Sequence, residues 1–159
     1  QLPNREGFHR RATEVLTNTD SETAAILFID LDGFKPVNDE YGHAAGDLVL
    51  ATAAKRLQSV TRSVDLLARM GGDEFVILVG ASADRPVNAA RVQVIADRAL
   101  QELRREIDIG SSTVTISASI GAVIAPAPAT LEDLLAKADA AMYEAKRNHG
   151  DQHHIVSLG

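Results

Sequence analysis

The chain has 159 residues, a hydrophobic content of 45% and a formal net charge of −6 at pH 7. This length is enough for one domain with a substantial core, so we expect residues 1–159 to form a single domain. The acidic balance argues against general nucleic-acid binding, which needs a basic surface. There is no long apolar run, no signal-peptide layout and no cysteine. These absences favour a cytoplasmic domain without disulfides or membrane contact.

The two ends of the sequence carry separate expectations. The chain starts at "QLPNR" without an initiating Met, so we expect an N-terminally truncated piece of a longer protein, whose parent could be membrane-tethered. Residues 150–159 are expected to be a mobile C-terminal tail with a possible short strand. His149 and His153 are four residues apart, a metal-ligand spacing on a helix, but Gly150 interrupts the helix between them.

Hydrophobic patterns predict helices and strands that alternate along the chain. The predicted elements are a helix over 5–17, a buried strand over 24–29, a short helix after 33, a helix over 42–60, two strands over 65–70 and 75–79, a helix over 88–106, a strand over 112–125 and a helix from 131 to about 148. This order predicts an α/β (α+β) fold in which helices flank a mostly antiparallel central sheet.

Acidic residues stand at the ends of two predicted strands. Asp30 and Asp32 end the buried strand, and strand alternation points them the same way. Asp73 and Glu74 follow the glycine pair 71–72 at the tip of a predicted hairpin. If these tips meet, the carboxylates repel one another unless a cation is present, and an all-oxygen ligand set suits Mg²⁺. Taken singly, such acids are more often caps or turn formers.

The loop after the buried strand has the composition of a phosphate-binding loop. Gly33 lets the backbone N–H groups of Gly33 and Phe34 approach an anion near the start of a short helix, and Lys35 supplies a cation. Alone, this signal is weak, because such a segment is more often a surface loop.

Five blocks of sequence together resemble a known family. The blocks "LPNR", "FIDLDGFKPVNDEYGHAAGD", "RSVDLLARMGGDEF", "TISASIGAV" and "LLAKADAAMYEAKRN" are similar, in this order, to the GGDEF family of diguanylate cyclases. The resemblance covers residue 1 to about 148 and implies the nucleotide cyclase/polymerase palm fold. It implies that two facing domains, each holding one GTP, form cyclic di-GMP and release two pyrophosphates. Catalysis would need a homodimer, whereas the isolated domain would be monomeric or weakly associated.

The resemblance also implies a role for individual residues. The metal, Mg²⁺ with Mn²⁺ as an alternative, would be bound by Asp30, the carbonyl of Leu31, Asp73 and Glu74. Asp73 and Glu74 would be catalytic, and the sequence does not decide which acts as the base. The substrate-binding residues would be Gly33, Phe34, Lys35, Asn38, His43, Asp47, Gly71, Gly72 and Lys146. For His43, holding the start of a helix is an equally good explanation.

Arg62 and Asp65, in "RSVD", match the family's RxxD site for inhibition by the product. Arginine can grip guanine or phosphate, and the acid can accept from guanine. Without the family, an i, i+3 surface salt bridge of little energetic value would explain the pair equally well.

One position departs from the family. An arginine usually stands four residues after the lysine of the last helix, but here that position is Gly150, and Arg147 would face another way. The alternative function is therefore a weak or inactive GGDEF module that binds GTP or cyclic di-GMP and regulates an attached domain. The intact acids Asp30, Asp73 and Glu74 favour catalysis. The full signature disfavours a palm-fold enzyme that acts on one nucleotide.

Overall fold

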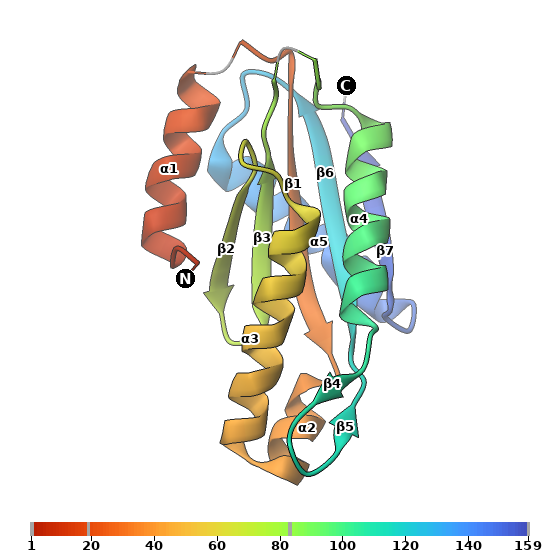
Figure 1. Cartoon of the computed structure of the whole chain (residues 1–159). Helices are drawn as coiled ribbons and strands as arrows, with labels where there is room; N and C mark the ends of the chain where they lie inside the picture. Colours follow the sequence, from red (N-terminus) through yellow and green to blue (C-terminus); the bar gives the residue numbers. More distant parts are fainter. Residues whose placement is uncertain (1, 19, 83, 159) are drawn as a thin grey trace.

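A five-stranded sheet forms the centre of the computed structural model, which describes residues 2–18, 20–82 and 84–158 (Figure 1). The strand order is β2-β3-β1-β6-β7, and only the β6–β7 pairing is parallel. The mostly antiparallel α/β fold predicted from sequence is therefore confirmed. The strands are β1 (Thr23–Asp32), β2 (Leu66–Gly71), β3 (Glu74–Val79), β6 (Ser117–Pro126) and β7 (Gln152–Ser157).

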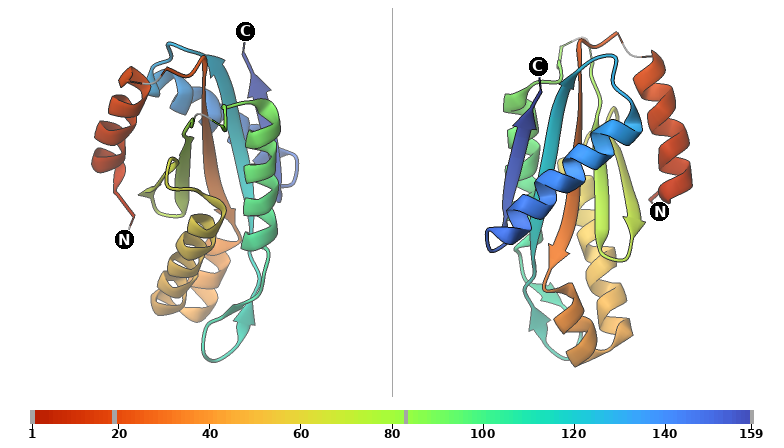
Figure 2. Two further views of the ribbon diagram at one scale, coloured as in Figure 1. Left: turned by 45° about the horizontal axis from the view of Figure 1, so that its top comes forward. Right: turned by 180° about the vertical axis from the view of Figure 1, so that it is seen from behind.

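Helices cover both faces of this sheet. One face carries α1 (Arg5–Asn18) and α5 (Leu131–Arg147), and the other carries α3 (His43–Val60) and α4 (Ala89–Leu103) (Figure 2). The short helix α2 (Phe34–Tyr41) follows β1 at the end of the sheet. Thr130 caps α5 by accepting from the Asp133 N–H.

Alternation along β1 decides which face receives the acids. Leu27 and Ile29 join the core under α3 and α4, whereas Ile26 and Phe28 join the core under α1 and α5. β1 runs to Asp32, three residues beyond the predicted end. Asp30 and Asp32 therefore lie on the face of the sheet that α1 and α5 cover.

One expectation for the C-terminal third is wrong, and another is met by a short strand. The strand expected over 112–125 is divided: β5 (Thr113–Val114) pairs with β4 (Ile107–Asp108) in a separate two-stranded sheet, and β6 begins at Ser117. The possible short strand of the C-terminal tail is present as β7, which pairs with β6. Helix α5 returns the chain across the sheet, so β7 adds in parallel at the edge, where a polar, half-buried strand can be accommodated.

No helix within the described ranges is both long and apolar enough to cross a membrane.

Candidate active site

The end of β1 and the tip of the β2–β3 hairpin lie side by side. β1 pairs antiparallel with β3, which places Asp30 opposite Glu74. The Leu31 N–H donates to the carbonyl of Asp73 at 3.1 Å. Gly72 takes a left-handed conformation (φ 48°) at the bend, which glycine adopts without steric cost. The structure thus brings together the three acids that the sequence placed at separate strand ends.

Two of these carboxyl groups, Asp73 and Glu74, have a raised pKa. Burial raises the pKa of Asp73, and the negative charge of Asp30 raises it further. Burial also raises the pKa of Glu74, followed by the charges of Asp30, Asp139 and Asp73. The cluster therefore disfavours its own full ionisation and would be stabilised by a bound cation.

Helix α5 places Lys146 against the same cluster. Its Nζ lies 2.5 Å from Oδ2 of Asp30 and 3.7 Å from Oδ1 of Asp32. Burial lowers the pKa of Lys146, but the hydrogen bond to Asp30 and the charges of Asp30, Asp32 and Asp73 together raise it above its ordinary value. Lys146 is therefore a permanent positive charge at neutral pH.

The acid cluster fits a hard divalent cation. Oδ1 of Asp30 is buried and has no hydrogen-bond partner among the described residues. A buried oxygen without a partner is costly, and this one is available as a ligand. Within the described ranges, no three His, Cys, Asp or Glu side chains are already arranged around a metal position. Mg²⁺ suits such a site, because it takes one or two carboxylates and completes its shell with phosphate oxygens and water.

Asp32 has a different environment from Asp30. Both of its carboxylate oxygens accept from Oγ of Ser119 at 3.0 Å, and Oδ2 also accepts from Oγ of Ser117 at 3.4 Å and from the Asp151 N–H at 2.9 Å. Asp32 therefore fastens β6 and the start of β7 to β1. The fully buried Ser119 was missed in the sequence, because only the cross-strand register opposite Asp30 shows its position.

The turn after α5 explains why glycine occupies position 150. Gly150 has φ +68°, and a Cβ there would lie 2.6 Å from Oδ2 of Asp32. A side chain at this position would meet a carboxylate that is already fixed by its hydrogen bonds. Arg147 pairs with a neighbour on its own helix, since its Nη1 lies 3.3 Å from Oε1 of Glu144.

The two histidines near the end of the chain do not share a helix. His149 lies in the turn after α5 with φ +80°, whereas His153 lies on β7. Nε2 of His153 is 2.7 Å from Oδ1 of Asp97 on α4. Their spacing in the sequence is therefore not a helical metal-ligand pair.

The predicted phosphate loop joins β1 to α2 directly beside the acids. Gly33 is the N-cap of α2 with φ +84°, and a Cβ there would meet nothing within 4 Å. Phe34 packs partly against the core, and Lys35 is exposed on the first turn. The geometry leaves room for an anion to approach this loop.

The residues expected to contact guanine lie where α2 meets α3. A Cβ on Gly46 would lie 2.1 Å from Oδ1 of Asn38, so glycine lets the Asn38 side chain rest against α3. Asp47 follows Gly46, is exposed, and lines a cavity of about 520 Å³ between α3 and β2. His43 is the exposed first residue of α3. Asn38 and Asp47 therefore lie on neighbouring helices at one junction.

Asp65 does not form a surface salt bridge with the side chain of Arg62. It is buried, and its Oδ2 accepts from the backbone N–H of Arg62 at 2.9 Å. Oδ1 accepts from the Gly80 N–H at 2.9 Å and from Nη2 of Arg91 at 3.1 Å. The Arg62 side chain is exposed beside this network. Arg91, 26 residues away in sequence, had no local signal.

Comparisons with known proteins agree with this fold and these motifs. The family description "Diguanylate cyclase, GGDEF domain" matches residues 1–152. The chain is 42% identical over 149 residues to the bifunctional diguanylate cyclase/cyclic di-GMP phosphodiesterase MucR of Pseudomonas aeruginosa, covering 92% of the chain and 21% of MucR. It is 41% identical over 161 residues to the diguanylate cyclase TpbB of the same species, covering 99% of the chain and 36% of TpbB. The chain thus spans about a fifth to a third of these relatives.

Solved structures of GGDEF-type domains have the same fold as this chain. The crystal structure of the GGDEF domain of TpbB from P. aeruginosa superposes with a TM-score of 0.89 at 40% identity, covering 100% of this chain and 99% of that one. The active GGEEF domain of a diguanylate cyclase from Vibrio cholerae superposes with a TM-score of 0.86 at 25% identity, covering both chains fully. The chain belongs to the GGDEF family of diguanylate cyclase domains.

Proposed function

We propose that this domain is a Mg²⁺-dependent diguanylate cyclase. Two copies, each holding one GTP, join the nucleotides into cyclic di-GMP with release of two pyrophosphates. The observation that supports this most strongly is the convergence of Asp30, Asp73 and Glu74 at one sheet end, with Lys146 against them. A domain that only binds nucleotide would have no need for three mutually repelling carboxyl groups.

The proposed roles follow from the chemistry of each group. Asp30, the carbonyl of Leu31, Asp73 and Glu74 would hold the metal, Mg²⁺ or Mn²⁺. When bound, the metal would neutralise phosphate charge and lower the pKa of the attacking 3′-hydroxyl. The raised pKa of Asp73 and of Glu74 makes either group a better proton acceptor than an ordinary carboxylate.

The remaining residues bind and orient GTP. Lys35 and Lys146 hold phosphates as point charges, and the N–H groups of Gly33 and Phe34 add donors at the start of α2. Carboxylate and amide groups, at Asp47 and Asn38, match the donors and acceptors of guanine. His43 lines the nucleotide, and the glycines 71–72 leave room for it at the hairpin tip. Holding two nucleotides in line supplies most of the catalysis that such a reaction needs.

The test is a product analysis. The domain, fused to a dimerising coiled coil, is incubated with GTP and Mg²⁺, and the nucleotides are separated by chromatography. We expect cyclic di-GMP from the fused dimer, a much lower rate from dilute unfused domain, and no product from the Asp73→Ala fusion. GTP binding without any product from the fused dimer would contradict the proposal.

Gly150 favours a second candidate function. With no arginine at this position, and no space for one beside Asp32, phosphate binding has one cation fewer than is usual in the family. The domain would then bind GTP or cyclic di-GMP and regulate an attached domain. Retained binding without turnover in the product analysis would support this alternative.

We further propose that cyclic di-GMP inhibits the enzyme by binding at Arg62 and Asp65. Arg62→Ala is expected to raise the inhibition constant for cyclic di-GMP about tenfold, because one charge-assisted hydrogen bond is worth roughly 1.5 kcal/mol. The uninhibited initial rate should not change, since Arg62 is exposed and lies outside the acid cluster. Inhibition curves with added product measure both quantities. Arg11→Ala, an exposed arginine on α1, is the control, and matching curves for Arg62→Ala and wild type would refute the site.

A further inference from the structure

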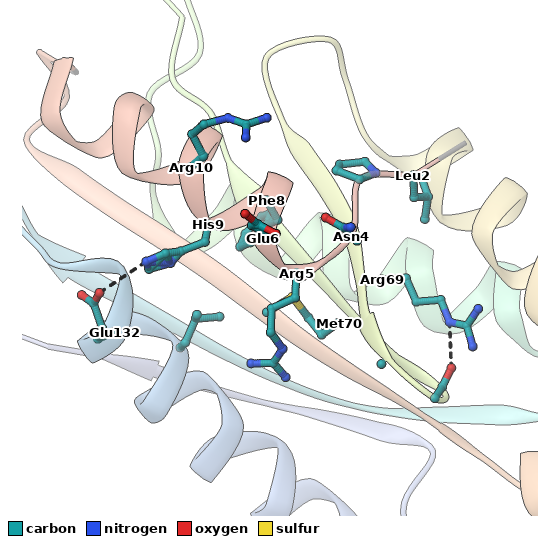
Figure 3. A pocket seen from close by; sticks show the side chains of 14 residues that line it. Leu2, Asn4, Arg5, Glu6, Phe8, His9, Arg10, Arg69, Met70 and Glu132 are labelled. Carbon is teal, nitrogen blue, oxygen red and sulfur yellow. Dashed lines mark hydrogen bonds and ion pairs between the residues drawn. The ribbon is translucent and has the colours of Figure 1, made fainter.

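A pocket of about 1160 Å³ lies between α1, α5 and the β2 side of the hairpin (Figure 3). Its floor is apolar and includes Phe8 of α1, Met70 of β2 and Leu135 of α5. Glycines 71–72 of the hairpin form part of its wall. Neither of the lysines proposed to hold phosphate, Lys35 or Lys146, lines it. The pocket therefore shares the hairpin glycines with the site described above but contains none of the charged residues of that site.

The polar lining of this pocket is rich in arginine, although the whole chain is acidic. Arg5, Arg10 and Arg69 line it together with two glutamates, Glu6 and Glu132. Glu132 is engaged by His9, whose Nε2 lies 3.6 Å from Oε1. The pocket lining therefore has more positive than negative side chains, although the protein has a formal net charge of −6. All three arginines are exposed, so a ligand in the pocket can reach their guanidinium groups.

Arg5 is the cation of this pocket that is best placed for a ligand at the hairpin. Its side chain makes no hydrogen bond or ion pair with any other described residue, and it points past Met70 toward the hairpin and α5 (Figure 3). Its charge acts on Glu74, whose pKa it lowers against the stronger raising effects of burial and the neighbouring acids. Arg69, by contrast, uses its Nε to hold the carbonyl of Gly72 at 2.9 Å and so fixes the hairpin.

We propose that this pocket receives the triphosphate of the GTP held by a second copy of the domain, and that Arg5 binds it. The inference rests on the proposed cyclase function, because that reaction brings two nucleotides to one hairpin. The GTP of the same chain would lie with Lys35 and Lys146, and neither of these lysines lines the pocket. The Arg5 guanidinium, beside the hairpin and apart from both lysines, is therefore available to the second nucleotide. Arginine suits this task, since its planar fork binds phosphate oxygens in pairs.

The test separates binding of the chain's own GTP from the joint reaction. In the coiled-coil fusion, we expect Arg5→Ala to lower kcat for cyclic di-GMP at least tenfold. In the unfused domain, its Kd for α,β-methylene GTP, which cannot release pyrophosphate, should stay within twofold of wild type. Arg5→Lys should recover part of the rate. Arg11→Ala removes the same charge from the same helix outside the pocket and should change neither quantity.

Each other result overturns the inference. An unchanged kcat would show that Arg5 contacts no reacting nucleotide. A tenfold weaker Kd, in parallel with the rate, would assign Arg5 to the GTP of its own chain. A melting temperature lowered by Arg5→Ala but not by Arg11→Ala, together with a slower rate, would make its role structural. If the wild-type fusion forms no product, the cyclase proposal fails and this inference fails with it. If wild type and Arg5→Ala are equally active, only the inference fails.

Discussion

Asp30→Asn is expected to lower the rate of cyclic di-GMP formation by roughly 1000-fold in the dimerised domain. Asp30 carries the buried oxygen without a partner, lies opposite Glu74 and holds Lys146. Asparagine keeps the shape but removes the charge that would bind a divalent cation. Electrostatic stabilisation of phosphoryl transfer by such a cation is worth several kcal/mol, and about 4 kcal/mol corresponds to this factor.

The same substitution should not destabilise the fold at neutral pH. Removing the Asp30 charge relieves the repulsion that raises the pKa of Asp73 and of Glu74. It also removes the main partner of Lys146, but the side chain of that lysine is 44% exposed, so the lost ion pair is worth little. We therefore expect a melting temperature equal to or above that of wild type.

The dependence of stability on pH provides an independent measurement. A carboxyl group whose pKa is raised on folding binds more protons in the folded state, so stability falls as pH rises from the ordinary value of about 4 through the raised value. Asp73 and Glu74 both behave in this way. Asp30→Asn should flatten this fall in the melting temperature measured between pH 4 and 7. An unchanged slope, or a rate within tenfold of wild type, would contradict the electrostatic account of the site.

The sequence predicted the acids of the site because their signals are local. Asp30 follows an apolar run, and Asp73 and Glu74 follow two glycines at a bend, so each could be assigned to a strand end without knowledge of the fold. The pairing of Asp30 with Glu74 depends on the β1–β3 register. No local sequence pattern fixes that register. From the sequence, the metal site could therefore be predicted only on the condition that the two strand ends meet.

Contacts between distant segments could not be predicted. Asp65 was correctly singled out, but its partner Arg91 comes from a helix that approaches only in the folded chain. β7 reads as a polar tail, since its pairing with β6 depends on how α5 crosses the sheet. Arg5 belongs to the block "LPNR", but the sequence assigned it no role, and only the pocket beside the hairpin suggests one.

Gly150→Arg, which restores the residue usual in the family, is expected to destabilise this domain by about 2 kcal/mol and to give no gain in activity. An L-residue at φ +68° costs roughly 1 kcal/mol or more relative to glycine. The new Cβ would also lie 2.6 Å from Oδ2 of Asp32. That carboxylate cannot move away without breaking its bonds to Ser119 and to the Asp151 N–H.

Thermal unfolding and cyclase assays on Gly150→Ala and Gly150→Arg separate the backbone from the charge. Alanine adds the same Cβ without a cation, so both variants should melt about 4–8 °C below wild type. If Gly150→Arg instead raised the rate at an unchanged melting temperature, the turn after α5 would have to be adaptable, and Asp32 would not be the residue that excludes arginine. If both variants lose stability as expected, Asp32 is needed to hold β7 in place and leaves no room for an arginine at position 150. The domain would then bind phosphate through cations elsewhere in the site.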